Sequence, residues 1–396
     1  MKRNANGSGT IYKRDDGRWE GKYSMPAADG SGKYVRKSVY GKTQEEVRKK
    51  ITEVTAEIDD GTYVAPSQYK MSEWIDLWLD TYVKPSVKHT TYTSYESVCE
   101  NHIKPVLGRI PLKSISTTQI QRFYNNLIEK GELSGKTIKN IHAILHKALE
   151  QAFYISEIKQ NPADRCTLPK FARRKIEPME NEDIVGFLEA IKGHQFEIVY
   201  FVTLFTGLRK GEILGLTWDS VDFENNVLLI DKQLQHYARR QPAYELASTK
   251  SGKERYVAVA PAVMEALAKQ KAKQEEMVRV AGSAWNNEWN LVFTNELGRH
   301  LCHETVYRNF KRIVKKLGIE KKRFHDLRHT YAVASIESGD DIKTVQENLG
   351  HATASFTLAT YAHATLGMKR ESANRMDAFI RSVQEGGENH TPSAGA

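Results

Sequence analysis

The first sixty residues alternate between apolar and polar positions and then change to a helical pattern. A period of two occurs in three segments, residues 9–13, 18–23 and 34–39, with Asp and Gly turn residues between them. This pattern predicts a three-stranded antiparallel sheet. Thr43 and Glu46 have the spacing of a capping box, and apolar residues follow at helical spacing as far as Ile58. We therefore expect a β module with one helix over residues 1–65.

From about residue 71 to 163 the apolar residues recur every three or four positions, which is typical of amphipathic helices. Pro85 should end the first helix and Pro105 the second, because proline lacks the backbone N–H that a helix interior needs. The apolar stripe of the first helix consists of Trp74, Leu77, Trp78 and Tyr82. The later helices are expected at residues 90–103, 117–128 and 134–154. We expect a four-helix bundle within a domain of residues 66–165.

Residues 166–176 are basic and flanked by prolines, as is typical of a linker, and residues 177–385 form a second, α-rich pattern. Two apolar β segments, 227–230 and 255–259, interrupt that pattern and flank a polar hairpin. Residues 386–396 are expected to be a disordered tail. The predicted fold class is mainly α with small β elements.

Composition limits the class of protein. The chain has 396 residues and a mass of 45.0 kDa, and 40% of its residues are hydrophobic, enough for sizeable cores. Its cysteines, Cys99, Cys166 and Cys302, have no ligand-like spacing, so we expect neither a disulfide scaffold nor a Cys-based zinc site. No apolar run approaches 18 residues, and the N-terminus lacks a signal-peptide core, which excludes membrane and secreted classes. A bacterial cytosol, close to the nucleoid, is the expected location.

The charge favours nucleic acid as a partner. The net charge is +9 and the pI about 9.1, and residues 1–50 contain 13 Lys/Arg against 6 Asp/Glu. An ordinary solvated sheet is one interpretation of the N-terminal module, and a sheet inserted into a DNA groove is the other. Under the second interpretation the DNA-contacting residues are Arg18, Lys22, Arg36 and Lys37 in the module and Lys170, Arg173, Arg174 and Lys175 in the linker.

Arg209 lies between two apolar helical segments, directly after a C-capping Gly207. Burying an arginine there is costly unless an anion meets it, and the guanidinium fork suits phosphate. A salt bridge to Glu212 is the alternative. Lys250 lies in the polar hairpin, where most lysines are simply exposed.

The segment 325–330 (HDLRHT) is more specific. His325 and Arg328 would share one helix face, and His325 and His329 have the spacing of zinc ligands. A metallohydrolase is nevertheless disfavoured, because the residue after His325 is not Glu and no third ligand follows. Downstream, His351 follows a helix-ending Gly350, and Tyr361 lies ten residues further along.

Together these residues resemble the tyrosine recombinase (phage integrase) family in order and in flanking sequence. The matching segments are TGLRKGE at 206–212, HDLRHT at 325–330 and LGH at 349–351. The resemblance covers about residues 177–383, and it implies that residues 66–165 bind core DNA sites and residues 1–65 bind arm sites. Tyr361 falls one residue later than in chromosome-dimer resolvases, a spacing similar to that of integrases from conjugative transposons and temperate phages.

The resemblance implies the following roles. Tyr361 is the nucleophile that forms a 3′-phosphotyrosine, and Arg209 and Arg328 bind the phosphate. Lys250 is the general acid, His325 the base and His351 a hydrogen-bond donor to the phosphate, with Glu212 orienting Arg209. No cofactor or metal is implied. The implied partners are double-stranded DNA, three further copies in a homotetramer, an excisionase and a host DNA-bending protein. The apolar stripe of residues 366–383 packs either on its own domain or on a neighbouring protomer.

Three other functions remain open at this stage. A type IB topoisomerase shares the covalent chemistry, and a chromosome-dimer resolvase shares both the chemistry and the tetramer. The N-terminal sheet counts against both. A DNA-binding repressor without catalytic activity would not need the six residues in this order. The predicted function is integration and excision of a mobile element by site-specific recombination.

Overall fold

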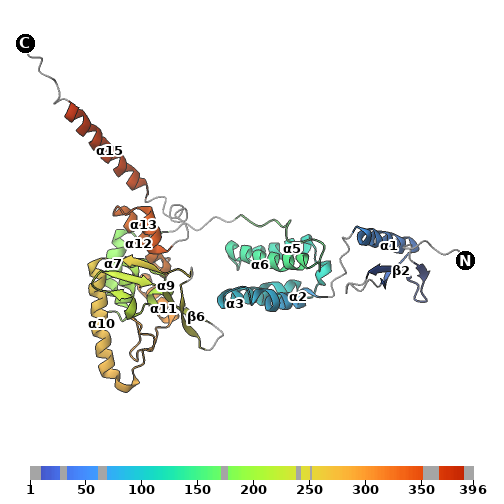
Figure 1. Ribbon diagram of the computed structural model, residues 1–396, viewed down its shortest axis with the longest axis horizontal. Coiled ribbons are helices and arrows are strands. Elements are labelled where there is room, and N and C mark those ends of the chain that lie inside the picture. The colour runs from blue at the N-terminus through green and yellow to red at the C-terminus, as the bar shows by residue number, and fades with distance from the viewer. Residues whose placement is uncertain are drawn as a thin grey trace, which may run out of the picture. The chain divides into compact units, whose positions relative to one another are not determined.

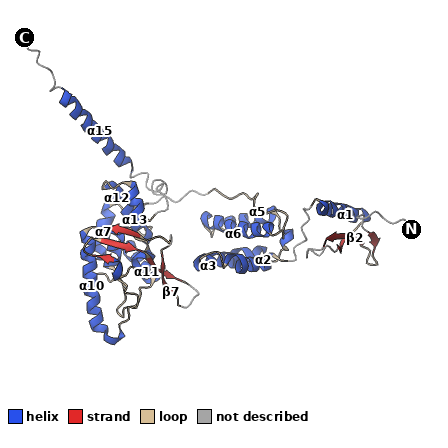
Figure 2. Ribbon diagram, in the orientation of Figure 1, coloured by secondary structure: helices blue, strands red, loops and turns tan. Residues whose placement is uncertain are grey.

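The computed structural model describes residues 10–26, 34–60, 69–170, 177–237, 242–249, 252–350 and 365–387. The chain divides into two compact units, residues 1–172 and 173–396, and the division falls inside the predicted linker. Helices make up most of the described residues in each unit and the strands form small sheets, which confirms the predicted fold class (Figure 2). No helix among the described residues is both long and apolar enough to cross a membrane.

The N-terminal module is the predicted three-stranded antiparallel sheet with one helix (Figure 1). Strands β1 (Thr10–Lys13), β2 (Trp19–Pro26) and β3 (Tyr34–Gly41) pair in sequence order, and α1 (Gln44–Asp59) packs on one face. A Cβ at Gly21 would lie 2.4 Å from Val47, so glycine permits this close approach. The predicted N-cap is confirmed, because Thr43 accepts a hydrogen bond from the Glu46 N–H at 3.1 Å, whereas the Glu46 carboxylate accepts from the Lys42 N–H at 2.8 Å.

The predicted helical bundle follows. Its elements are α2 (Met71–Trp78), the π turn η1 (Leu79–Val83), α3 (His89–Val98), the π turn η2 (Cys99–Ile103), α4 (Lys104–Leu107), η3 (Leu112–Ser114), α5 (Thr117–Glu129) and α6 (Gly135–Tyr154). Trp74 lies at the centre, fully buried, and its indole N–H donates to the Ala148 carbonyl at 2.9 Å. The core is otherwise aliphatic and aromatic, which explains the amphipathic spacing of the sequence.

Two details of the bundle prediction are wrong, the end of the second helix and the buried face of the first. Pro105 does not end the second helix, because the Lys104 N–H bonds to the Cys99 carbonyl five residues back and the helix continues through α4. Pro105 follows directly after this π turn, and the wider turn accommodates a proline that has no N–H to donate. In the first helix Leu77 lies before η1 and is exposed, because the buried face of α2 consists of Met71, Trp74, Ile75 and Trp78; within η1, Val83 is buried and Tyr82 is half-buried.

The second unit is an α-rich domain around an aromatic core that includes Phe187, Tyr200, Phe310 and Phe324. Its helices are α7 (Asn181–Ile191), α8 (Glu197–Thr206), α9 (Lys210–Leu214), η4 (Trp218–Ser220), α10 (Pro261–Ala281), η5 (Gly282–Ala284), α11 (His303–Lys316), α12 (Phe324–Glu337), α13 (Ile342–Leu349) and α15 (Thr365–Gly387). On α15 the apolar side chains of Met376, Phe379, Ile380 and Val383 are exposed.

The β insertion contains more structure than the sequence predicted. Strands β4 (Val221–Asp222), β5 (Val227–Ile230) and β8 (Arg255–Ala258) form one sheet, as expected for the two apolar segments. Between them β6 (Lys232–His236) and β7 (Tyr244–Ser248) form a separate two-stranded ribbon where only a polar hairpin was predicted. The ribbon packs against α9, since a Cβ at Gly215 would lie 2.3 Å from the Leu234 nitrogen. The insertion therefore supports the helix that follows Arg209.

Candidate active site

Arg209 lies at the N-terminus of α9, in a turn that glycine makes possible. Gly207 ends α8 with a left-handed φ of 64°. A Cβ there would lie 2.5 Å from Tyr331 and 2.7 Å from Leu349, so a larger residue would both strain and clash. The predicted C-cap is thus confirmed, and it turns the chain so that Arg209 begins the next helix.

Glu212 holds Arg209 at both its backbone and its side chain. The Arg209 N–H donates to one carboxylate oxygen at 2.9 Å, and Nη1 donates to the other at 2.6 Å. Glu212 is 1% exposed, whereas 25% of the Arg209 side chain remains open to solvent. The salt bridge that was the alternative interpretation of Arg209 therefore exists, and it leaves part of the guanidinium accessible to a ligand.

Glu212 is ionised because two arginines meet it. Burial alone would raise the pKa of its carboxyl, but the hydrogen bond and charge of Arg255, followed by those of Arg209, lower that pKa to about 2. Arg255, the first residue of β8, donates through Nη1 and Nη2 to the two carboxylate oxygens at 3.1 and 2.7 Å. This side chain is 11% exposed.

Arg328 is almost completely buried, with 1% exposure, in the middle of α12. Its Nη1 donates to the Gly207 carbonyl at 2.8 Å and its Nη2 to the Leu349 carbonyl at 2.5 Å. Its helix is fixed at the start by a capping pair, because Asp326 accepts from the Arg323 N–H at 2.8 Å. Buried in this way, Arg328 connects the turn before Arg209 with the end of α13.

Three arginines meet at the C-terminus of α13, one at each of three successive carbonyls. Arg255 donates to Asn348, Arg328 to Leu349 and Arg209 to Gly350. The last carbonyls of a helix have no intrahelical partner and carry the negative end of its dipole, so cations are favoured there. Gly350 itself has a left-handed φ of 61°, as predicted for the end of this helix. The arrangement draws together Arg209 and Arg328, which are 119 positions apart in the sequence.

His325 and His329 lie one turn apart on α12, and their rings meet edge to face at 4.8 Å. His325 is exposed at the surface, and neighbouring protein atoms and the Arg328 charge still lower its pKa to about 4. Burial likewise lowers the pKa of His329, which is 6% exposed, to about 4. Both rings are therefore neutral near pH 7, so His325 can accept a proton.

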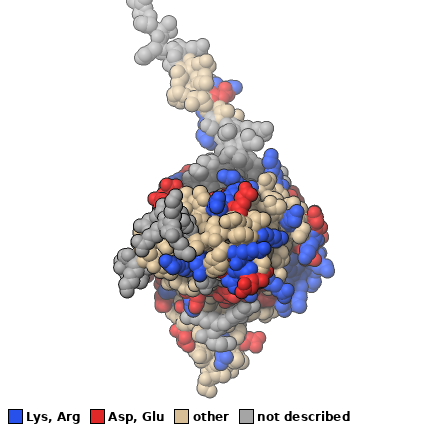
Figure 3. All heavy atoms as spheres, turned by 90° about the vertical axis from the view of Figure 1, so that its right-hand side faces the viewer, with Lys and Arg blue, Asp and Glu red and all other residues tan. Residues whose placement is uncertain are grey.

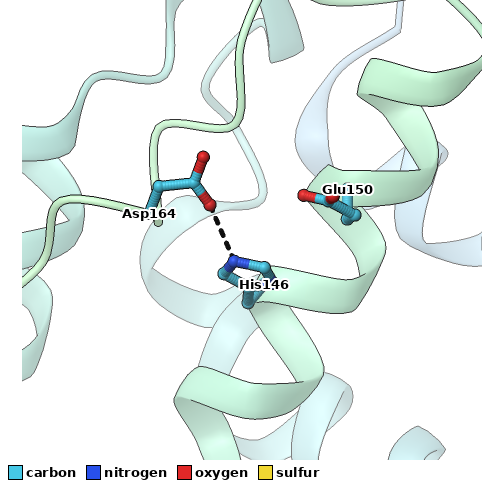
Figure 4. A group of neighbouring side chains, drawn as sticks. All are labelled: His146, Glu150 and Asp164. Atoms are coloured by element: carbon cyan, nitrogen blue, oxygen red, sulfur yellow. Dashed lines mark hydrogen bonds and ion pairs between the residues drawn. The ribbon is translucent and has the colours of Figure 1, made fainter.

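Within the part of the chain that the structure describes, one group of three side chains could hold a metal ion, and it lies in the helical bundle. Donor atoms of His146, Glu150 and Asp164 all lie within 4.8 Å of one another (Figure 4). His146 already contacts Asp164 at 2.7 Å, and Glu150 accepts from Asn161 at 2.8 Å. Among the described residues no such group includes His325 or His329, so the zinc-like spacing in the sequence has no third ligand there.

The remaining predicted catalytic residues, Lys250, His351 and Tyr361, lie outside the described residues, as do Arg173, Arg174 and Lys175. Of the predicted DNA contacts that are described, Arg18, Lys22, Arg36, Lys37 and Lys170 are exposed. Strand register places Lys22 and Arg36 on the sheet face that points away from α1 and Lys37 on the opposite face. Figure 3 shows basic side chains gathered on the molecular face that it draws, with acidic side chains between them.

Sequence reasoning missed Arg255. It was identified only as the start of a strand, because its partners Glu212 and Asn348 lie 43 and 93 residues away. Sequence reasoning also missed the role of Asp326, which caps α12. A capping signal is visible in hindsight, since Arg323 and Asp326 have the N-cap to N3 spacing.

Comparison with known proteins gives consistent matches. Residues 174–367 match the model of the phage integrase family, and residues 70–128 match that of the phage integrase N-terminal SAM-like domain. A tyrosine recombinase XerC-like protein of Caldanaerobacter subterraneus subsp. tengcongensis is 31% identical over 89% of this chain and 94% of its own length.

Two solved structures share the fold. The Tn1549 transposon integrase in complex with a circular intermediate DNA has a TM-score of 0.67 and 23% identity, covering 78% of this chain and 100% of the other. A lambda integrase tetramer bound to a Holliday junction has a TM-score of 0.57 and 18% identity, covering 89% and 97%.

Proposed function

This chain belongs to the phage integrase family of tyrosine recombinases, and we propose from that premise how its active site works. It is a site-specific DNA recombinase, and we propose that it is an integrase, which integrates and excises a mobile element. The observation that carries the proposal is the meeting of Arg209 and Arg328 at the end of α13, with neutral His325 on α12. Two cations and a proton acceptor in one place suit the transfer of a phosphodiester.

The proposed reaction exchanges one phosphodiester for another without an external energy source. The Tyr361 phenol oxygen attacks the scissile phosphorus, and the bond to the 5′ oxygen breaks. The products are a 3′-phosphotyrosine and a free 5′-hydroxyl. Attack by the 5′-hydroxyl of the other DNA duplex then releases the tyrosine, so that each step conserves the bond energy.

Arg209 and Arg328 would stabilise the non-bridging oxygens, where negative charge grows in the transition state. A donor of this kind is typically worth ~10²–10³ in rate. His325 would take the phenol proton, Lys250 would protonate the leaving 5′ oxygen, and His351 would donate to the phosphate. The two arginines provide the positive charge that a metal would otherwise supply, so we propose a metal-independent reaction.

The remaining domains would recognise DNA. We propose residues 66–165 as the core-site domain, 166–176 as a basic linker, 177–385 as the catalytic domain and 1–65 as the arm-site module. In that module Lys22 and Arg36 lie exposed on the sheet face opposite α1. The active assembly would be a homotetramer on DNA, with the exposed stripe of α15 docked on a neighbouring protomer. An excisionase and a host DNA-bending protein are the proposed accessory partners.

A covalent-trapping assay tests the chemistry. The full chain is mixed in EDTA with a nicked duplex from an end of the DNA element that encodes it, beside Tyr361→Phe. The expected result is a protein–DNA adduct on a denaturing gel that the variant does not form, although the variant still binds the duplex. An adduct with Tyr361→Phe would move the nucleophile elsewhere, and binding by the wild type without an adduct would favour a DNA-binding protein without catalytic activity.

A chromosome-dimer resolvase is the second candidate, because one relative is named XerC-like. Deletion of residues 1–65 separates the two functions. An integrase should keep core-site cleavage and lose high-affinity binding to a second class of DNA site. Unchanged binding to all sites would remove the arm-site assignment and favour the resolvase.

A further inference from the structure

We propose that Arg255 is a positioning residue for strand exchange, which orients Glu212 and the end of α13 so that Arg209 faces the scissile phosphate. The inference rests on the proposed function of Arg209. It assigns a role to a strand residue that the family resemblance did not single out.

All three nitrogens of the Arg255 guanidinium are engaged within the protein. Nη1 and Nη2 pair with the two oxygens of Glu212, and Nε donates to the Asn348 carbonyl at 2.8 Å. The side chain is 11% exposed, and these contacts tie it to Glu212 and to the end of α13. Its effect must therefore pass through the groups that it holds.

The first such group is Glu212. Its carboxylate contacts both arginines, with Arg209 on one side and Arg255 on the other. A carboxylate bonded through both oxygens to a planar fork has a fixed orientation. That orientation determines where the Arg209 Nη1 lies, because Nη1 is 2.6 Å from the same oxygen that Arg255 Nη1 contacts.

The second group is the end of α13. Arg255 holds Asn348, and its side chain lies against Gly350, where a Cβ would be 3.1 Å from Nη1. Arg209 donates to the Gly350 carbonyl at 2.9 Å, so Arg255 supports both ends of the Arg209 guanidinium. A shift of about 1 Å in a catalytic group can cost 10²-fold in rate, which makes such support effective.

The test compares Arg255→Met with wild type on three nicked duplexes from the element end, by single-turnover adduct formation. One has the natural scissile phosphodiester, one a methylphosphonate and one a bridging 5′-phosphorothiolate at the same position. The methylphosphonate lacks one negative oxygen, and the phosphorothiolate has a leaving group that needs no general acid. Arg279→Met, which removes an exposed ion pair with Glu276 on α10, is the matched control.

If Arg255 acts through Arg209, the variant should lose about ten- to a hundredfold in rate on the phosphodiester and phosphorothiolate, yet less than about threefold on the methylphosphonate. An equal loss on all three duplexes would mean a smaller folded fraction and would overturn the proposal. Recovery on the phosphorothiolate alone would also overturn it, since Arg255 would then act through the general acid.

Arg255→Lys sharpens the result. Lysine keeps the charge but lacks the planar fork, so the loss on the phosphodiester should persist. Full activity of this variant would overturn positioning by the fork. The proposed function is tested separately, by the wild type and Tyr361→Phe. If the wild type forms an adduct and Tyr361→Phe does not, the proposed function stands whatever the Arg255 variants do. If the wild type forms no adduct, the proposed function is rejected, and the role of Arg255 is not the cause.

Discussion

The helical bundle and the catalytic unit handle charged side chains in opposite ways. In the bundle no Asp, Glu, Lys or Arg among the described residues is buried, and ion pairs such as Lys84 with Asp80 lie at the surface. In the catalytic unit Glu212, Asp326 and Arg328 are all at most 4% exposed. Burying charge is costly, so a fold retains it where geometry matters more than stability. The contrast indicates that the bundle is built for stability and the catalytic unit for placement of charge.

Glu212→Ala should produce the largest effect and test this contrast directly. The substitution leaves Arg209 and Arg255 without their shared carboxylate, so the free energy of unfolding should fall by about 3–5 kcal/mol. Chemical denaturation followed by the fluorescence of the catalytic unit measures it. Glu304→Ala is the control, because that exposed residue pairs with Arg308 at the surface. An equal loss of unfolding free energy in the two variants would contradict the idea that burial makes the Glu212 ion pairs costly to break.

Trp74→Phe should have the next largest effect, confined to the bundle. It replaces a fully buried indole by a smaller phenyl ring and removes the hydrogen bond to Ala148, at an expected cost of about 1–3 kcal/mol in unfolding free energy. Thermal unfolding measures the loss. Adduct formation per DNA-bound molecule, measured below the transition, should not change. A lower rate for bound protein would mean that the bundle core also shapes the active site.

The stability of the catalytic unit should fall in acid, because a buried histidine must be protonated there. The folded pKa of His329 is about 4 against an ordinary value of 6.5, so the unfolded state binds more protons between these values. The contribution of His329 to the free energy of unfolding is therefore fully present above pH 6.5. It decreases as the pH drops toward 4, by at most about 1.4 kcal/mol per pH unit. Denaturation midpoints from pH 7 to 4 measure the slope, and His329→Gln should flatten it. An unchanged slope in that variant would assign the acid sensitivity elsewhere.

Lys84→Ala should have the smallest effect. Its pair with Asp80 is exposed on both sides and screened by salt, so the melting temperature should not change measurably. A clear decrease at moderate salt would show that the bundle also depends on its ion pairs.

Local signals in the sequence predicted much of the fold and part of the site. Gly207 and Gly350 were recognisable as helix ends because each needs a left-handed backbone, and the Thr43 N-cap marked the start of α1. The pairing of Arg209 with Glu212 was foreseen as an alternative, since the two residues are three positions apart. Arg255 could not be foreseen, because its contacts cross 43 and 93 residues.

The π turns in the bundle have a consequence for how its helices should be compared with those of relatives. Each turn holds one residue more than an α-helical ladder requires. The first helix ends with its turn at Leu79–Val83, but α4 continues the second helix after Cys99–Ile103 and is out of phase with α3 by about 100°. A helical wheel drawn across the second turn therefore assigns residues to the wrong face. A relative that lacks the extra residue can present the same side chains on a regular α-helix. A one-residue gap in its alignment at the turn therefore marks the missing π turn, and the contacts on either side of the gap can be the same.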